Sequence, residues 1–314
     1  MKAIGIDLGG TNLRAALVDT AARRGVLENE CKVRLPGTSP EVVVEVIGNA
    51  VDTVGPPGAA VGIGIAAMLR GDTGIVDNSP NLGWRDVDLR GMVERRLPGR
   101  RIVLANDVDA IAFGEYRFGA GAGSEHLLCI YAGTGIGGGI VAGGRLLAGA
   151  SGIPAEIGHS KVVWGPRARP CGCGQHGCIE AYAGGKNLSA RARAELAAGA
   201  QSLAVELAGG DPDQVNPSHL DDAAARGDPY AVALWDEIAP LFGMVVANAV
   251  TLLNPGRVIF GGGVLWGAEE LRRRMLDAYR VMVNAPSGAA CVIVEAELGE
   301  AAGILGSASL AGGP

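Results

Sequence analysis

The sequence is poor in aromatic residues and in charge. Its 314 residues include four phenylalanines, five tyrosines and four tryptophans, and only 19% of them are charged. The formal net charge is −6, so the chain lacks the positive excess with which proteins displace counterions from nucleic acids and anionic membranes. We therefore expect small molecules as partners, with no nucleic acid and no membrane.

The sequence also lacks an export signal and a convincing membrane span. Asp7 places a carboxylate where a signal peptide needs its apolar run, so we expect a cytoplasmic protein. The longest uncharged stretch, residues 127–144, contains seven glycines and is interpreted as strands joined by a turn. A second uncharged stretch, residues 240–256, is interpreted as a buried helix.

Cysteine is too sparse for a disulfide framework in a chain of this length. Three of the six cysteines stand alone, and the others form the pattern Cys171-x-Cys173-x4-Cys178. Three thiolates with one imidazole are the ligands of a closed, structural zinc site. His159, twelve residues upstream, and His176, inside the loop, are both candidates for the fourth ligand, and the local spacing does not decide between them.

Glycine, by contrast, is abundant: 51 residues, about twice the usual share. There is no collagen-like period and 48% of the residues are hydrophobic, which excludes fibrous and disordered chains. Glycines instead follow apolar strands at residues 9–10, 133–139 and 261–263. Such turns let backbone N–H groups approach a phosphate, although hairpin turns need the same conformational freedom.

The pattern of apolar residues alternates between strands and helices, which predicts an α/β protein. The expected strands are residues 3–8, 13–18, 61–65, 102–104, 127–131, 138–141 and 258–260, and the expected helices are residues 41–52, 108–118 and 229–253, the last kinked at Pro240. A unit of strand, glycine turn and strand therefore occurs twice.

The missing motifs narrow the type of nucleotide site. No P-loop sequence is present. Gly133-x-Gly135-x-x-Gly138 matches the dinucleotide fingerprint, but the turn opens a strand where that fingerprint requires a helix, so a Rossmann site is disfavoured. Asp7 ends the first strand, where it is suited to a hard cation or to capping the turn. Asp107 ends another strand, where it is suited to general-base chemistry or to capping a helix.

These motifs together resemble the sugar kinases of the ROK family, and within it the bacterial glucokinases. The resemblance is carried, in order and spacing, by Asp7-Leu-Gly-Gly-Thr11-Asn12, Asn106-Asp107, Gly133-Thr-Gly-Ile-Gly137, Glu156-Ile-Gly158-His159 and Cys171-Gly-Cys-Gly-x-x-Gly-Cys-x-Glu180. It implies the actin-like, ribonuclease H-like ATPase fold, with two α/β domains and a cleft between them. We expect a small domain from residues 1–113 plus 300–314 and a large domain, with the zinc loop, from residues 114–299.

The resemblance also implies the site residues of an ATP-dependent hexose kinase. Asp107 matches the catalytic base, and Asp7 matches the carboxylate near Mg²⁺. The implied sugar ligands are Asn81, Asn106, Asp107, Glu156, His159 and Glu180. The implied ATP-binding residues are Asp7, Gly9, Gly10, Thr11, Asn12, Gly133, Thr134, Gly135, Gly137, Gly261, Gly262 and Gly263. The family pattern favours His159, Cys171, Cys173 and Cys178 as structural zinc ligands, and it implies a dimer or a tetramer.

Two departures from the family pattern bear on the substrate. Ala66-Ala67 replaces the usual Pro-Gly, so the Ala67 methyl group could alter the preference among hexoses. Asp109 adds a carboxylate that, if it faces the cleft, would raise the pKa of Asp107. Glucose is the expected substrate; fructose, mannose, N-acetylglucosamine and N-acetylmannosamine are alternatives. A DNA-binding, sugar-sensing member of the family is disfavoured because the first motif begins at residue 7, and a zinc-stabilised oxidoreductase is more remote.

Overall fold

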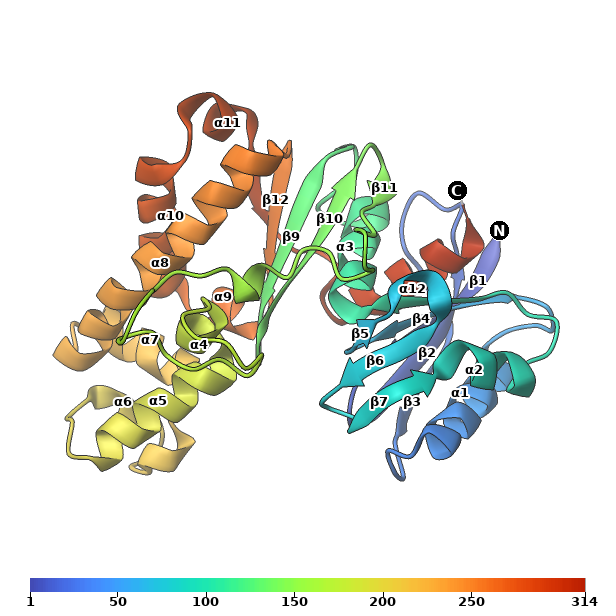
Figure 1. Ribbon diagram of the computed structural model, residues 1–314, viewed down its shortest axis with the longest axis horizontal. Coiled ribbons are helices and arrows are strands. Elements are labelled where there is room, and N and C mark those ends of the chain that lie inside the picture. Colours follow the sequence, from blue (N-terminus) through green and yellow to red (C-terminus); the bar gives the residue numbers. More distant parts are fainter. Residues whose placement is uncertain (314) are drawn as a thin grey trace. The chain divides into compact units, whose positions relative to one another are not determined.

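The computed structural model describes residues 1–313, which form two compact units (Figure 1). Unit 1 comprises Met1–Cys129, Gly139–Ala155 and the chain from Ala296 onward, and unit 2 comprises Ile130–Gly138 and Glu156–Glu295. This division differs from the boundaries expected from the sequence, because residues 114–129 and 139–155 join the N-terminal part. The helix that contains residues 114–118 packs against the C-terminal helix, which explains why these residues belong to unit 1.

Unit 1 is built on a five-stranded sheet with the order β3-β2-β1-β4-β8. Its strands are β1 (Lys2–Leu8), β2 (Asn12–Asp19), β3 (Leu27–Arg34), β4 (Ala60–Ile65) and β8 (Ile102–Asn106). The predicted hairpin is confirmed, since β1 and β2 pair antiparallel with Asp7 opposite Arg14. β4 and β8 continue the sheet in parallel, so their carboxyl ends meet at one edge.

Helices cover both faces of this sheet. Alternate residues of β1, among them Ile4 and Ile6, pack against α1 (Pro40–Val54) and α2 (Leu89–Arg96). The opposite face, which includes Ala3, packs against α12 (Ala302–Gly312), and α3 (Asp107–Phe118) lies beside α12 (Figure 1). A small second sheet holds β5 (Met68–Leu69), β6 (Ile75–Ser79) and β7 (Trp84–Asp88), and η1 (Gly71–Thr73) and η4 (Gly299–Ala301) are short 3₁₀ turns.

The packing of α12 depends on glycines within the strands. A Cβ on Gly5 would lie 1.9 Å from the Ile304 carbonyl oxygen, and one on Gly62 would lie 1.8 Å from that of Ser307. The helix backbone therefore rests directly on the backbone of β1 and β4. Part of the glycine excess thus serves backbone packing, a use that differs from the turns expected from the sequence.

Another five-stranded sheet has the order β11-β10-β9-β12-β13. Its strands are β9 (Leu127–Ala132), β10 (Ile136–Ala142), β11 (Arg145–Leu146), β12 (Arg257–Gly261) and β13 (Val292–Glu295). The helical elements of unit 2 are η2 (Ile157–His159), α4 (Glu180–Ala183), α5 (Gly185–Ala197), α6 (Leu203–Leu207), η3 (Pro212–Gln214), α7 (Pro217–Ala225), α8 (Pro229–Leu253), α9 (Gly263–Gly267), α10 (Glu269–Met282) and α11 (Ala285–Ala290).

The long helix α8 begins and ends where the sequence predicts. Asp228 caps its first turn by accepting a hydrogen bond from the Ala231 N–H at 2.9 Å, and Asn254 closes it in the left-handed conformation with φ 45°. Pro240 lies inside a helix that continues on both sides of it. α8 is long and apolar enough to cross a membrane by length and composition, but 56% of its most apolar window is buried within the protein, as in a core helix.

Candidate active site and metal centre

Asp107 is the first residue of α3, directly after strand β8. The preceding residue, Asn106, caps the helix: its Oδ1 accepts hydrogen bonds from the N–H groups of Val108 and Asp109 at 2.9 and 3.3 Å. The Asn106 side-chain amide donates to the Ala67 carbonyl at 3.1 Å. Asn106, predicted as a sugar ligand, therefore fixes the backbone that carries Asp107. Capping thus falls to Asn106, which leaves the general-base interpretation of Asp107 intact.

The surroundings of Asp107 raise the pKa of its carboxyl group from 3.8 to about 6. Burial is the largest cause, a hydrogen bond from the Val108 N–H at 3.0 Å opposes it, and the negative charge of Asp7 raises it further. The negative charge that raises the pKa of Asp107 is therefore that of Asp7, whereas the sequence suggested Asp109 for this role. Asp109 is buried and lines a cavity of about 350 Å³ within unit 1. A carboxylate with a pKa near 6 is matched to proton abstraction near neutral pH.

Asp7 is held in place by an arginine that the sequence analysis did not identify. The Arg14 guanidinium donates to Asp7 Oδ2 at 2.8 Å and to Glu300 Oε2 at 2.5 Å. The other carboxylate oxygen, Oδ1, lies next to Gly303 of α12, where an added Cβ would approach to 3.5 Å. One carboxylate oxygen combined with substrate phosphates is a usual protein contribution to a Mg²⁺ site, so Asp7 fits that ion. The signal for Arg14 was its place opposite Asp7 in the predicted hairpin.

The first glycine turn lies against another predicted residue, Asn81. The Gly9 N–H donates to the Asn12 carbonyl at 3.0 Å, which closes the turn between β1 and β2. A Cβ on Gly10 would lie 2.8 Å from the Asn81 carbonyl oxygen. The turn that joins β6 to β7 thus approaches this glycine turn closely enough to require glycine at position 10.

The second glycine turn, residues 133–137, borders a cavity in unit 2. The Gly133 N–H donates to the Gly135 carbonyl at 2.9 Å. The cavity has a volume of about 640 Å³, and Gly133, Thr134 and Gly263 line it, together with the cationic side chains of Lys186 and Arg193. Neither cation was predicted, because α5 follows the turn by some fifty residues and nothing in its sequence marks it as a neighbour.

The third glycine turn divides into packing and lining residues. A Cβ on Gly261 would overlap the Tyr131 ring at 2.4 Å, and one on Gly262, whose φ is 87°, would come within 2.5 Å of the Ala132 carbonyl oxygen. Gly261 and Gly262 therefore let the turn pack against β9. Gly263 lines the cavity described above.

The predicted sugar ligands of unit 2 form a second cluster. His159 Nε2 lies 3.7 Å from Glu156 Oε2. Desolvation raises the pKa of the Glu156 carboxyl group, the His159 ring opposes this, and the negative charge of Glu180 raises it further. Ala155, directly before Glu156, adopts the left-handed conformation with φ 54°, which costs an alanine about 1 kcal/mol. Such strain often accompanies functional sites.

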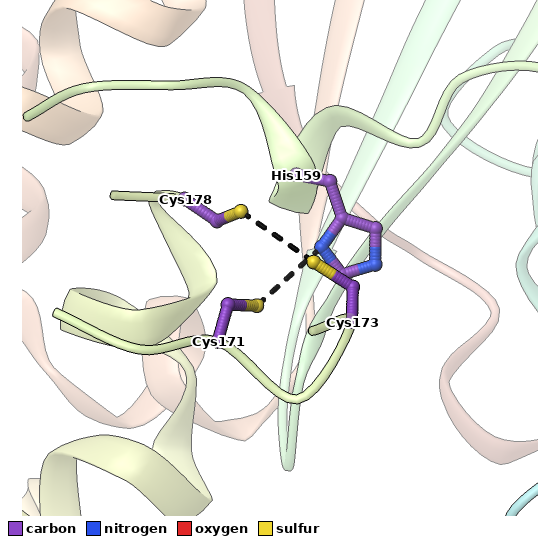
Figure 2. Close-up of side chains that lie close together, drawn as sticks. All are labelled: His159, Cys171, Cys173 and Cys178. Carbon is purple, nitrogen blue, oxygen red and sulfur yellow. Dashed lines mark hydrogen bonds between the residues drawn. The ribbon is translucent and has the colours of Figure 1, made fainter. Parts of the chain in front are cut away.

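The four predicted metal ligands converge in unit 2 (Figure 2). The donor atoms of His159, Cys171, Cys173 and Cys178 all lie within 4.8 Å of one another. Cys171 Sγ is 3.7 Å from His159 Nδ1, and Cys173 Sγ is 3.7 Å from Cys178 Sγ. Tetrahedral zinc with ordinary Zn–S and Zn–N bonds sets its ligand atoms about 3.6–3.8 Å apart, so the donor set fits that metal.

Of the two histidines considered as the fourth metal ligand, the cluster contains His159 and not His176. In the loop that carries the cysteines, the residue pairs Lys161–Cys178 and Pro170–His176 form isolated β-bridges. At Gly177, where φ is 77°, a Cβ would lie 1.9 Å from the Val163 carbonyl oxygen. Lys161 Nζ lies 2.9 Å from Cys178 Sγ, which places a positive charge beside one of the predicted metal ligands.

The predicted residues fall into two groups, one in each unit. Unit 1 contains Asp7, Gly9, Gly10, Thr11, Asn12, Asn81, Asn106 and Asp107. Unit 2 contains Gly133, Thr134, Gly135, Gly137, Glu156, His159, Cys171, Cys173, Cys178, Glu180, Gly261, Gly262 and Gly263. Each group combines a glycine turn with carboxylates.

Known proteins with similar sequences and structures match the whole chain. A glucokinase of Streptomyces coelicolor is 38% identical over 316 residues, which cover 99% of this chain and 98% of the relative. The ROK hexokinase of Thermus thermophilus is 33% identical with a TM-score of 0.83 and covers 99% and 98% of the two chains. A ROK glucokinase of Streptomyces griseus, solved in complex with glucose and AMPPNP, is 36% identical with a TM-score of 0.78 and covers 99% of both. The model of the ROK family matches residues 3–313, and the chain therefore belongs to the ROK family.

Proposed function

We propose that this protein is a sugar kinase that transfers the γ-phosphoryl group of ATP to the 6-hydroxyl group of a hexose, with glucose as the principal substrate. The observation that carries the proposal is the carboxylate of Asp107, which has a raised pKa and follows a cap formed by Asn106. Full-length similarity to glucokinases, one of them solved with glucose and an ATP analogue, supports the choice of substrates.

In the proposed reaction, Asp107 accepts the proton of the sugar hydroxyl as the hydroxyl oxygen attacks the γ-phosphorus, and the bond from the γ-phosphorus to the β–γ bridging oxygen breaks to release ADP. Phosphoryl transfer otherwise depends on positioning and on neutralising charge. The backbone N–H groups of residues 9–12 and 133–137 would bind the phosphates, and the cavity beside Lys186 would take the nucleoside. Asp7 would hold Mg²⁺, which supplies positive charge to the β- and γ-phosphate oxygens.

The sugar would be bound by polar side chains. We assign its hydroxyl groups to Asn81, Asn106, Glu156, His159 and Glu180. The four metal ligands would hold a structural Zn²⁺, which fixes the tautomer of His159 because Nδ1 faces Cys171 and Nε2 faces Glu156. This orientation leaves Nε2 on the side of the proposed sugar ligands.

The test of the reaction is a coupled ADP-release assay with glucose, mannose, fructose, N-acetylglucosamine and N-acetylmannosamine. We expect glucose to give the highest kcat/KM. Asp107→Ala should lower kcat by a factor of about 10² to 10⁴ and leave the Kd for sugar nearly unchanged. If the wild-type protein binds sugar but phosphorylates none of the five sugars, it is a sugar-sensing protein and the proposal is overturned.

Ala67 is the residue we assign to the choice among hexoses. Its side chain is buried, and its carbonyl oxygen accepts the hydrogen bond from the Asn106 amide. One methyl group changes discrimination by a factor of about 10 to 200 in a tight pocket. Ala67→Gly should therefore change the ratio of kcat/KM between glucose and the larger N-acetyl sugars, and an unchanged ratio would remove Ala67 from the specificity site.

The remaining parts of the proposal concern the state of the protein in the cell. We propose a cytoplasmic enzyme that acts as a dimer or tetramer, by analogy with its family. Light scattering coupled to size-exclusion chromatography measures the oligomeric state directly. A monomer at micromolar concentration would contradict the proposed dimer or tetramer.

A further inference from the structure

The glycine turn 133–137 of unit 2 is held by a side chain that lies far from it in sequence. The Ile136 N–H donates to Glu180 Oε2 at 2.9 Å. A Cβ on Gly135 would lie 2.5 Å from the same oxygen, so glycine at this position lets the carboxylate approach the backbone. Glu180 is therefore in direct contact with the turn that we assign to the phosphates.

Glu180 lies next to the segments that carry the predicted metal ligands. Glu180 follows Cys178 by two residues, and the intervening Ile179 donates its N–H to the carbonyl oxygen of Ser160 at 2.9 Å. Ser160 is the residue after His159. The two segments that carry metal ligands are thus joined by a backbone hydrogen bond one residue away from Glu180.

A second contact links the histidine segment to the same turn. A Cβ on Gly158 would lie 2.1 Å from the Ile136 carbonyl oxygen, so Gly158, the residue before His159, packs directly on the turn. Glu180 Oε1 lies 3.8 Å from Cys171 Sγ. Ile136 is therefore contacted through its N–H and its C=O by the two segments that the metal would join.

The opposite side of the turn is fixed by helix α5. The N–H groups of Gly185 and Lys186 donate to the carbonyl oxygens of Gly133 and Thr134 at 2.8 and 3.0 Å. These bonds hold the beginning of the turn, whereas Glu180 and Gly158 hold its end. The predicted metal ligands lie on the segments that hold the end of the turn.

We propose that the Cys₃His metal site positions the glycine turn 133–137 for the nucleotide phosphates, with Glu180 and Gly158 as the positioning residues. This inference rests on the proposed function, since it concerns the nucleotide of the same reaction. Without a metal, the segments of His159 and Cys178 keep the hydrogen bond between Ile179 and Ser160 but have no bonds that fix the ligand side chains, so the contacts at Ile136 loosen. The metal site then acts on nucleotide binding in addition to its proposed effect on the sugar ligand His159.

The experiment measures nucleotide affinity in the absence of any sugar. Calorimetric titration with AMPPNP and Mg²⁺ compares the metal-loaded protein, the metal-stripped protein and the variants Glu180→Ala and Cys173→Ser. We expect each of the three perturbed forms to bind AMPPNP about tenfold more weakly or worse. Glu206→Ala on the exposed face of α6 and Cys291→Ser outside the cluster are the matched controls, and both should bind as the wild type does.

A second measurement separates local loosening from unfolding. Amide hydrogen exchange of residues 133–137 should accelerate in the stripped protein, whereas exchange in the core of α8 should stay slow. If α8 also opens on stripping, Glu180→Ala decides the question, because that variant keeps all four metal ligands. The amides of the first glycine turn, residues 9–12 in unit 1, serve as an internal reference.

Two results would overturn the inference. One is an AMPPNP affinity within twofold of the wild type in the stripped protein and in Glu180→Ala, which is what a role of Glu180 in sugar binding alone would give. The other is slow exchange at residues 133–137 without the metal. Failure of the proposed function is distinguished by the wild type: a loaded protein that binds no AMPPNP and phosphorylates no hexose would refute the kinase itself.

Discussion

Replacing the proposed catalytic base by its neutral isostere, Asp107→Asn, should make the protein more stable while it loses activity. The pKa of the Asp107 carboxyl group is raised from 3.8 to about 6, so the native protein disfavours the ionised form. A shift of about two pKa units corresponds to roughly 3 kcal/mol of free energy of unfolding at neutral pH. Asparagine removes the charge and retains an oxygen for the Val108 N–H, so about 2 to 3 kcal/mol should be regained.

The pH dependence of this gain follows from the direction of the shift. Between about pH 4 and pH 6 the native state holds a proton on Asp107 that the unfolded chain has released, so wild-type stability falls as pH rises through this window. The asparagine variant has no such loss. Its advantage should therefore be near zero below pH 4, grow up to pH 6 and stay constant above it.

Urea unfolding at pH 4 and pH 7.5 measures the effect, with Asp72→Asn on the surface of unit 1 as the control. In thermal unfolding, the same 2 to 3 kcal/mol corresponds to an increase in Tm of roughly 4–12 °C for a unit of this size. A variant that is no more stable than the wild type at pH 7.5, or equally stabilised at both pH values, would refute the conclusion that burial and Asp7 disfavour the charge.

Three further predictions concern rate, metal and packing. The kcat/KM for hexose should fall tenfold per pH unit below about pH 6, where Asp107 becomes protonated. Asp7→Asn should move this acidic limb of the pH–rate profile to lower pH, because the variant removes a negative charge that raises the pKa of Asp107. An unmoved limb would exclude this effect of Asp7 on Asp107. Elemental analysis should find about one zinc per chain, and Cys173→Ser should lower that content, whereas equal zinc in both proteins would place the metal elsewhere. Gly306→Ala should lower the free energy of unfolding by about 1 to 3 kcal/mol, because its Cβ would lie 1.7 Å from the Ala110 carbonyl oxygen; unchanged urea unfolding would show that the two helices separate without cost.

Local sequence signals predicted the elements that carry the site. Short apolar runs that end at glycine predicted the hairpin of β1 and β2, and the pair Asp228-Pro229 with Asn254 predicted the ends of α8. Each of these signals lies within a few residues of the feature it predicts. The ligand set of the metal site also followed from spacing, apart from the choice between two histidines.

Features that depend on distant segments could not be predicted in this way. By its position in β1, Gly5 could be any apolar residue that faces the core. Only the close approach of α12 requires this residue to lack a side chain. Lys186 lines the cavity because α5 donates hydrogen bonds to the glycine turn, and no motif in α5 indicates this. Nearness in sequence suggests that Asp109 would raise the pKa of Asp107 if it faced the cleft, whereas the negative charge that raises this pKa belongs to Asp7.

The packing of α12 on β1 and β4 has a consequence for how the protein is made. Unit 1 contains β1 and needs residues 302–312 to cover one face of its sheet. During translation this face, with Asp7 at its edge, stays open until α12 has left the ribosome, and by then all of unit 2 has emerged. Unit 2 therefore has the opportunity to fold first, and unit 1 is completed last. A chain cut short before α12 would expose an apolar sheet face and be an early target for chaperones and proteases.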